Sequence, residues 1–295
     1  MKRRFGSTFS LAALPILAAL SVGCSSSDGS TDSAGGASAN AGSSSRAGST
    51  GHAGASSHGG ANGTGGKPGS DGGYLGPTLA TAQPFAALAY SAISAANVSP
   101  VTGNLGVSAG AMSNITGFDA PTDEKYGTDS LAPNAQRTIV AQQDVTALIG
   151  DIDPRACDAD YTDVVGGLTG DITLHPGVTC MNSFSADVLL NGHITLDAEH
   201  DPNAFFVIRS NLTLTVADGA HVVLANGAQA CGVFWSVKKQ VTIGKTVEFY
   251  GTIVAGTAIT MKTGSTLVGR ALAQTAGISL DANTITIPSE CSHPE

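Results

Sequence analysis

Hydroxyl side chains recur in the C-terminal half of the chain, each between two apolar residues in a short strand-like triplet. The central residues of six triplets are Thr173, Thr195, Thr213, Thr242, Thr260 and Ser279, and Ser94 is the centre of a weaker seventh. Because alternate side chains of a strand point to opposite faces, the aliphatic residues would face one way and the hydroxyls the other. A hydroxyl both donates and accepts hydrogen bonds, so the chemistry offered is an array of weak contacts and not a reaction centre.

The spacing of these hydroxyls indicates the architecture that must position them. Successive central residues are about 18 to 29 positions apart, which is the length of one coil of a β-solenoid and too long for a hairpin. Stacked coils would place the hydroxyls in a straight file, about 4.7–4.9 Å from one strand to the next. Thr257 and Thr275 lie at coil corners and would border this file. Such a surface would match a periodic partner.

The last three coils align on one another and predict three strands in each coil. The first strands cover residues 232–237, 252–256 and 270–274, and the third strands cover 246–250, 266–269 and 283–286. The first strands are apolar on both alternations, which predicts a cover on each side. Residues 134–149 contain no Gly or Pro and carry apolar residues at helical spacing, so this helix is the expected cover. The fold class predicted is mostly β, a solenoid of triangular cross-section with one long α-helix along a face.

The N-terminal quarter of the chain differs in composition from the rest. Residues 1–23 combine basic residues with an apolar stretch, as in an export signal, and Ser21-Val22-Gly23-Cys24 resembles a bacterial lipobox that would lipidate Cys24. The alternative is an ordinary secretory signal with a cysteine nearby. Residues 24–76 are rich in Gly, Ser and Ala and predict a disordered tether. Residues 77–288 form the predicted folded domain, and 289–295 form a tail. We expect a lipoprotein of the cell envelope, held in the outer membrane and facing the exterior.

Charge and cysteine content restrict the possible partners. The net charge of −9 argues against nucleic acid and against an anionic lipid surface. Membrane contact is therefore expected through the lipid anchor only, and the folded domain is expected to be a monomer. Four cysteines besides Cys24 predict two disulfides in an exported domain, and loop proximity favours Cys157–Cys180 and Cys231–Cys291.

Residue patterns typical of enzymes are missing from the sequence. It contains no His-Glu-x-x-His pair, Cys-x-x-Cys, phosphate-binding Gly loop with Lys, or Gly-x-Ser-x-Gly elbow. An acidic cluster at Asp151, Asp153, Asp158, Asp160 and Asp163 could bind calcium, although a solvated loop is the favoured interpretation. We therefore expect no catalytic residues, no metal site and no cofactor.

The chain resembles the microbial ice-binding (antifreeze) proteins over essentially residues 84–288. The resemblance is carried by Phe85–Tyr90, Thr102–Ser108, Ile115–Phe118, Gly167–Leu168, Leu174–Val178, Leu196–Ala198, Asp201–Phe206, Gly269–Ala273, Asp281–Thr284 and above all Asn226-Gly-Ala-Gln-Ala-Cys-Gly-Val-Phe-Trp235. It implies a right-handed discontinuous β-solenoid with a helix alongside, and ice as the ligand.

Members of that family bind ice through one flat face without a strict repeat, so the face must be inferred from this sequence. We assign it to the hydroxyl file at Ser94, Thr173, Thr195, Thr213, Thr242, Thr260 and Ser279. Threonine suits such a face because its branched side chain is stiff and its hydroxyl can bind ordered water. The alternatives are a cell-surface adhesin that binds a glycan or a neighbouring cell, and a solenoid enzyme acting on polysaccharide, for which the file offers no facing carboxylates.

Overall fold

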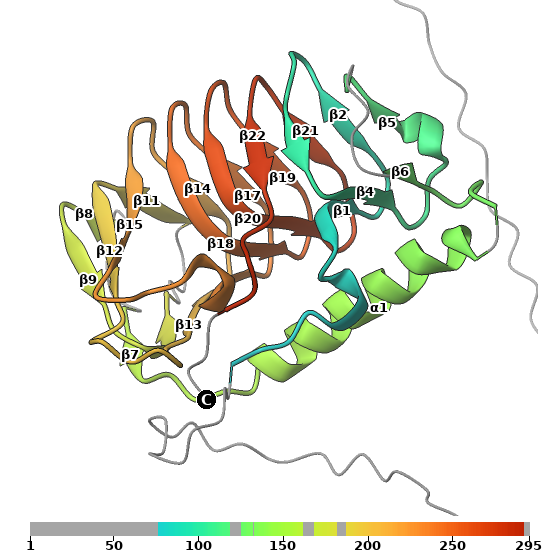
Figure 1. The fold of residues 1–295 in the computed structure, drawn as a ribbon. Coiled ribbons are helices and arrows are strands. Elements are labelled where there is room, and N and C mark those ends of the chain that lie inside the picture. Colours follow the sequence, from blue (N-terminus) through green and yellow to red (C-terminus); the bar gives the residue numbers. More distant parts are fainter. Residues whose placement is uncertain (1–75, 119–124, 132, 162–167, 182–186, 292–295) are drawn as a thin grey trace, which may run out of the picture. The chain divides into compact units, whose positions relative to one another are not determined.

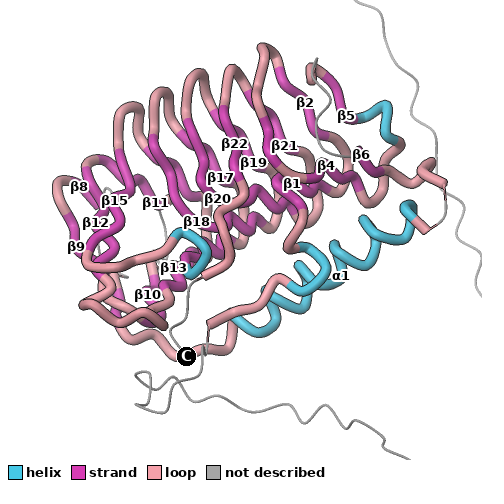
Figure 2. Tube along the Cα trace, viewed as in Figure 1, coloured by secondary structure: helices cyan, strands magenta, loops and turns pink. Residues whose placement is uncertain are grey.

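The computed structural model describes residues 76–118, 125–131, 133–161, 168–181 and 187–291. The export signal, Cys24 and nearly all of the expected tether lie outside these residues, so those interpretations remain predictions. The described part forms a β-solenoid whose coils have three sides, with one long helix alongside (Figure 1). All of its paired strands are parallel, and equivalent strands of successive coils lie side by side (Figure 2).

We name the three sides the covered face, the hydroxyl face and the mixed face. The covered face consists of β6 (Lys125–Tyr126), β4 (Asn104–Val107), β1 (Phe85–Ala89), the second halves of β20 (Thr266–Ala273) and β18 (Glu248–Ala255), β16 (Val233–Val237), β13 (Phe206–Ser210), β10 (Gly177–Cys180) and β7 (Ala159–Asp160). The hydroxyl face consists of β5 (Ile115–Thr116), β2 (Ile93–Ala95), β21 (Ile278–Leu280), β19 (Ile259–Met261), β17 (Val241–Ile243), β14 (Leu214–Val216), β11 (Val188–Asn191) and β8 (Leu168–Thr169).

The mixed face is the third side of each coil and connects the hydroxyl face to the covered face. It consists of β9 (Ile172–Leu174), β12 (His193–Asp197), β15 (His221–Ala225), the first halves of β18 and β20, β22 (Thr284–Thr286) and β3 (Val101–Thr102). Three short 3-10 helices, η1 (Ala80–Ala82), η2 (Met112–Asn114) and η3 (Ala230–Gly232), lie in connections. The sequence pattern predicts an irregular loop over residues 151–171, but this segment contains β7 and all of β8, each a two-residue strand at the solenoid end.

The coils do not follow one another in sequence order. Strands β1, β2 and β3, from the N-terminal part of the domain, pair with β20, β21 and β22 from the C-terminal part. Between them the chain returns along the solenoid through α1 (Asn134–Ile152) and starts again at the opposite end (Figure 1). This arrangement covers the edges of the last C-terminal strands, which would otherwise expose unpaired backbone groups.

Helix α1 covers the doubly apolar strands, as the sequence predicts. Its buried residues are Thr138, Ala141, Val145, Leu148 and Ile152, the same five that show helical periodicity in the sequence. They join one apolar cluster with outward-pointing residues of the covered face, including Val207, Phe234, Val254 and Leu272. Burying an aliphatic or aromatic side chain of this size contributes about 1.5–3 kcal/mol, so the helix is held mainly by this stripe.

Two long strands cross a corner of the solenoid at glycine. Strands β18 and β20 pass from the mixed face to the covered face at Gly251 and Gly269. Gly251 has φ +109°, and a Cβ on Gly269 would lie 1.9 Å from the carbonyl oxygen of Gly251. Neither position accepts a side chain, because the two coils approach closely and the backbone of Gly251 adopts a conformation that disfavours L-residues.

Both predicted disulfides, Cys157–Cys180 and Cys231–Cys291, are present. The first lies beside the C-terminal end of α1, where Arg209 from β13 is also found. The Nη1 of Arg209 donates hydrogen bonds to the carbonyl oxygens of Ile152, at 3.2 Å, and Arg155, at 2.8 Å, and also to that of Asp153. The guanidinium therefore satisfies carbonyl groups that a helix end leaves without intrahelical partners.

Candidate ice-binding face

A file of six hydroxyls crosses the hydroxyl face, one from each of six adjacent strands. Strand pairing places them in the order Thr116, Ser94, Ser279, Thr260, Thr242 and Thr215. Neighbouring strands of a sheet are about 4.7–4.9 Å apart, so the hydroxyls repeat at that spacing. In the next strand, Leu189 takes the position equivalent to Thr215 and ends the file.

Four of the six hydroxyls, those of Thr215, Thr242, Thr260 and Ser279, stand between two buried residues. In β19, for example, Ile259 and Met261 are at most 1% exposed, while Thr260 between them reaches the surface. The same pattern of a partly exposed residue between two buried ones holds in β14 and β17. Parallel strands and branched side chains leave little conformational freedom, so little side-chain entropy would be lost when the face binds a surface.

The side chains of the file are small and uncharged, and few charged side chains lie beside them. Two positions away along the strands, Ala or Gly stands at three of the six places on each side: Ala92, Ala258 and Gly277 on one side, and Ala96, Ala217 and Gly244 on the other. Lys262 and Asp281 stand two positions after Thr260 and Ser279, and they mark one margin of the face. In the described part of the chain only Thr242 among the six hydroxyls has a protein partner, the Nε2 of Gln240 at 3.2 Å. The remaining hydroxyls are free to bind water.

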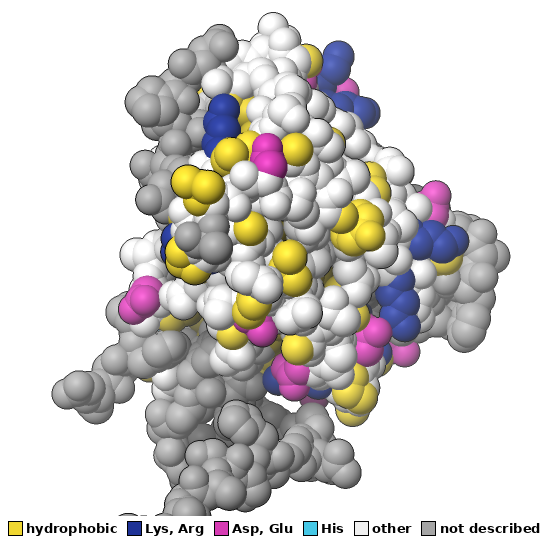
Figure 3. All heavy atoms as spheres, turned by 90° about the vertical axis from the view of Figure 1, so that its right-hand side faces the viewer, with side chains coloured by type: hydrophobic (Ala, Val, Ile, Leu, Met, Phe, Trp, Pro, Cys, Tyr) yellow, Lys and Arg dark blue, Asp and Glu magenta, His cyan; other side chains and the backbone are white. Residues whose placement is uncertain are grey.

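The solenoid end next to β5, where the file begins, is also sparsely charged. Figure 3 looks onto this end, and the surface it shows is mostly uncharged, with scattered apolar side chains and few Lys, Arg, Asp or Glu residues. This end therefore presents few charges next to the point where the file begins.

The mixed face presents a different chemistry. Asp171 and His193 are joined by a hydrogen bond of 2.9 Å, His193 stacks on His221 with ring centroids 5.6 Å apart, and His221 pairs in register with Glu248. The adjacent row contains Val223, which is 41% exposed, and Tyr250. His193, His221, Val223, Glu248 and Tyr250 line a shallow hollow of about 430 Å³. The face is neither uniform from coil to coil nor free of titratable groups.

Comparison with known proteins agrees with this architecture. Residues 87–286 match the family model described as ice-binding-like. The chain belongs to this family. It is 36% identical over 211 residues to an ice-binding protein of Nostoc sp. (strain HG1), covering 70% of this chain and 72% of the relative. It is also 34% identical over 224 residues to an ice-binding protein of Colwellia sp, covering 72% of this chain and 84% of the relative.

Solved structures of family members share the fold. An ice-binding protein from an Antarctic biological consortium superposes with a TM-score of 0.64 at 31% identity, over 75% of this chain and 95% of that one. An ice-binding protein from an Arctic yeast superposes with a TM-score of 0.66 at 28% identity, over 75% and 98% of the two chains. The solenoid predicted for this ice-binding-like chain is thereby confirmed.

Four of the seven residues assigned to the hydroxyl file from the sequence lie in it. Ser94, Ser279, Thr260 and Thr242 occupy four consecutive strands of one sheet. Thr257 and Thr275 lie at the corner that leads into β19 and β21, and the hydroxyl of Thr275 donates to the carbonyl oxygen of Gly256 at 2.7 Å. They lie next to the hydroxyl face, and their role as a border of the binding surface remains a prediction.

Three of the seven assignments were wrong in position. Thr173 and Thr195 pair with each other, but on the mixed face, where the next strand continues with Val223. Thr213 precedes β14 by one residue, and the register brings Thr215 and not Thr213 beside Thr242. The error arose because a triplet reveals only which side chains point inward. The spacing from Thr195 to Thr213 resembles one coil although it connects two different faces.

Thr116 and Thr215 were missed by the sequence reasoning. Leu214-Thr215-Val216 overlaps Leu212-Thr213-Leu214, and a shift of two residues preserves the inside–outside pattern, so alternation could not separate them. Thr116 follows Ile115 but precedes Gly117, so it lacked the second aliphatic residue of a triplet. Its alignment with Ser94 comes from strand pairing alone.

No group of three or more His, Cys, Asp or Glu side chains is placed to hold a metal ion within the described ranges. Within the same residues, no helix has the length and apolar character needed to cross a membrane.

Proposed function

We propose that this chain binds ice crystals through the hydroxyl face, as the proteins it is similar to are named for doing. The observation that supports this assignment of the face is the uncharged file of six hydroxyls on six adjacent strands. An ice surface is a lattice of water molecules, and a rigid periodic row of hydroxyl and methyl groups can hold such a lattice by many weak contacts. Binding would inhibit ice growth or recrystallisation, or attach the cell to ice.

A single ice crystal held in a solution of the full-length chain tests this proposal. We expect a faceted crystal and a gap between the melting and freezing temperatures. Thr260→Tyr should remove both, because a bulky ring at the middle of the file holds the face away from the lattice. Thr195→Tyr, the same change on the mixed face, is the matched control and should retain both. Round, freely growing crystals with the folded wild-type chain would refute ice binding.

An adhesin that binds glycans is the second candidate, and the hydroxyl face gives it little support. Glycan sites commonly present aromatic rings for stacking. Trp235, the only tryptophan, is fully buried, packs on Phe249 with ring centroids 4.8 Å apart, and donates from Nε1 to the carbonyl oxygen of Tyr250 at 2.9 Å. The relatives are ice-binding proteins and not enzymes, which likewise disfavours a polysaccharide-active solenoid.

We also infer that the domain is displayed from the cell envelope by a lipid on Cys24 and a tether covering residues 24–76. The lipobox-like Ser21–Cys24 and the Gly/Ser-rich composition that follows support this inference. Growth with a labelled fatty acid should label the wild-type chain and not a Cys24→Ser variant. Absence of label on the wild-type chain would refute the anchor, without bearing on ice binding.

A further inference from the structure

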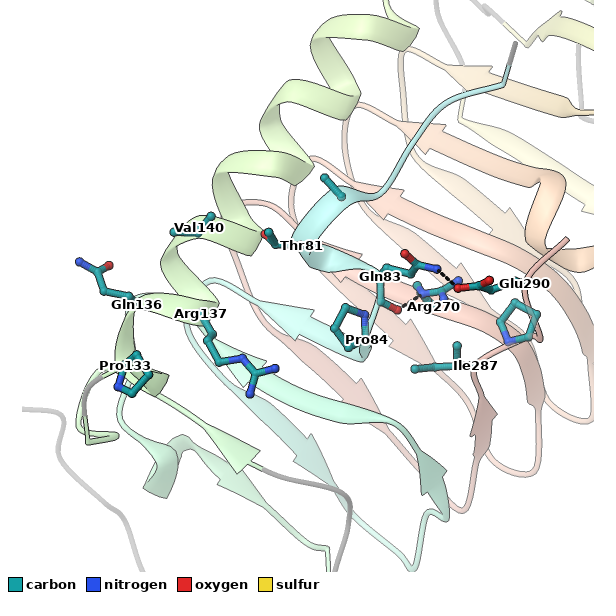
Figure 4. Close-up of a pocket in the computed structure, with 12 residues that line it drawn as sticks. Thr81, Gln83, Pro84, Pro133, Gln136, Arg137, Val140, Arg270, Ile287 and Glu290 are labelled. Carbon is teal, nitrogen blue, oxygen red and sulfur yellow. Dashed lines mark hydrogen bonds between the residues drawn. The ribbon is translucent and has the colours of Figure 1, made fainter. Parts of the chain in front are cut away.

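A groove of about 800 Å³ lies on the helix side of the domain, away from the hydroxyl face. Figure 4 shows it between the first turns of α1, the segment around η1, and the chain that leaves β22. Its apolar lining residues are Ala80, Pro84, Pro133, Val140, Ile287 and Pro288. The volume falls in the range of typical small-molecule sites, about 300–1,000 Å³, and the lining has their mixture of apolar walls and few polar groups.

A buried guanidinium lies at the base of this groove. Arg270 comes from the second half of β20 and is only 4% exposed. Its Nε donates to the carbonyl oxygen of Gln83 at 2.7 Å, and within the described residues it forms no ion pair. Burial lowers the pKa of Arg270 to about 10. Because only Nε of Arg270 has a partner in the described residues, the donors on both Nη groups remain unused beside the groove.

The solenoid itself does not require a charge at this position. The residues equivalent to Arg270 in neighbouring coils are Thr252, Phe234 and Val207. Arg209, the other arginine on a covered-face strand, donates to carbonyl groups at the end of α1, whereas Arg270 uses only Nε. The hydroxyl of Thr252, the register partner of Arg270, is buried without a partner in the described structure. Two polar groups at adjacent positions are thus short of partners.

The groove continues past Arg270 on its other side. A second hollow of about 430 Å³ shares Arg270, Gln83 and Glu290 with the first and extends toward Leu79 and Phe234. Arg270 therefore stands where two hollows meet, which favours a ligand of extended shape with its charged group at the guanidinium.

The charges around the groove favour an anion. Arg137 of α1 also lines it and lies over the ring of Tyr126, 5.0 Å from the centroid, with Nη1 donating to the Tyr126 hydroxyl at 2.9 Å. The carboxylate among the lining residues is Glu290, whose Oε1 accepts from Nε2 of Gln83 at 3.2 Å. The groove is thus lined by two guanidinium groups and one carboxylate, in a domain that is otherwise acidic.

We propose that this groove binds a monocarboxylate with an apolar chain, of the medium-chain fatty-acid type, with its carboxylate on the guanidinium of Arg270. A carboxylate fits the planar, two-donor edge that Nη1 and Nη2 present. The chain would lie against Val140, Pro84 and Ile287. The site is separate from the hydroxyl face and independent of ice binding.

Titration of the full-length chain with decanoate, below its micelle concentration, tests the proposal by calorimetry and by thermal unfolding. We expect saturable binding and a rise in Tm with ligand concentration, because a ligand that binds only the folded state stabilises it. Acetate lacks the apolar chain and 1-decanol lacks the charge, so both should bind at least roughly tenfold more weakly. Absence of decanoate binding, or equal binding of acetate or 1-decanol, would overturn the proposal.

Variants locate the site. Arg270→Gln removes the charge and should weaken decanoate binding by roughly tenfold or more, since hydrogen bonds between ionised groups are the strong ones. Because this change also removes a contact to Gln83, Val140→Glu provides an independent check: it adds a repelling carboxylate at a position that is already 39% exposed. Val223→Glu, at a 41% exposed valine of the mixed face, is the matched control. Unchanged decanoate affinity in Val140→Glu, or equal weakening in both glutamate variants, would refute this location.

Discussion

The hydroxyl face and the mixed face are built by the same rule and yet offer different surfaces. In both, aliphatic residues point inward and alternate with residues that face the solvent. On the hydroxyl face the outward row is Thr or Ser in six consecutive strands. On the mixed face one row contains Asp171, His193, His221 and Glu248, and the next row is interrupted by Val223 and Tyr250. The alternation therefore produces a buried core, but only uniformity from coil to coil produces a lattice-like surface.

The difference has a physical consequence for binding a crystal of water. Charged groups hold hydration shells that do not follow the repeat of the strands, and large side chains break the planarity of a face. Hydroxyls flanked by Ala and Gly carry no charge and leave the face planar. The comparison predicts that ice-binding activity depends on the hydroxyl face alone.

The largest effect is expected from a charge placed in the file. Thr242→Lys should abolish ice shaping and the freezing gap, because the ammonium keeps its own hydration and its long side chain rises above the face. Thr286→Lys places the same charge on an outward position of the mixed face and should leave both unchanged. Crystal morphology and the freezing gap measure the difference, and circular dichroism checks folding. Equal losses in the two variants would erase the functional distinction between the faces.

A second prediction concerns the corner that joins the two faces in the last coil. The buried Nδ2 of Asn283 donates to the carbonyl oxygens of Lys262, at 2.8 Å, and Ser265, at 3.2 Å, and its Oδ1 accepts from the backbone of Asp281. Asn283→Ala should lower the free energy of unfolding by about 3 kcal/mol, since buried backbone groups lose their partners. Denaturant unfolding measures the change, and the exposed Asn211→Ala is the control. A change below about 0.5 kcal/mol would show that this corner does not depend on the amide.

A smaller gain of function is expected where the file stops. Leu189→Thr would extend the row of hydroxyls by one strand beyond Thr215, and we expect a moderate increase in the freezing gap at the same protein concentration. Val223→Thr adds a hydroxyl to the mixed face and should produce no change. If both variants raise the gap equally, the number of surface threonines would matter more than their alignment.

The smallest effect concerns acid stability, in which the two faces should behave alike. Hydrogen bonds from Thr263 and Asn97 lower the pKa of Asp281, next to the hydroxyl face, from 3.8. The backbone of Glu199 and the side chain of Asn226 lower the pKa of Asp197, on the mixed face. A lowered folded-state pKa contributes stability above the unfolded pKa of 3.8, and this contribution is lost as the pH falls through the folded value.

Tm measured as the pH falls from 5 to 2 checks this point. Asp281→Asn and Asp197→Asn should each flatten the decline of Tm in acid. Neither should change how Tm depends on pH near neutrality. A decline as steep as that of the wild type in both variants would show that other carboxyl groups account for the acid sensitivity.

Much of the fold follows from residue patterns that are local. The helix was predicted over residues 134–149 from a stripe at helical spacing, and in the structure it continues through Gly150 to Ile152. The covered strands were predicted from residues that are apolar on both alternations. The three strands in each of the last coils were also predicted, because those coils are similar in length and align without gaps. The two disulfide pairings were correct as well.

The candidate site could be predicted only in part. In the regular C-terminal coils, Thr242, Thr260 and Ser279 were placed correctly. In the coils that contain Thr173, Thr195 and Thr213, the length varies, and the count of residues no longer identifies the face. Thr215 was hidden by an overlapping triplet with the same inside–outside pattern. Thr116 belongs to a coil that follows the C-terminal coils in space and precedes them in sequence.

The sequence by itself therefore determined which side chains point inward, where the single helix lies and that an uncharged hydroxyl surface exists. Those properties depend on alternation, helical periodicity and composition, which act over a few residues. Only the tertiary structure decided which hydroxyls share a strand-to-strand row, and it alone brought Arg270 to the groove beneath α1 and η1. Both results depend on strand register and on the return of the chain through the helix. Register is a relation between segments that lie far apart in the sequence, and no local pattern specifies it.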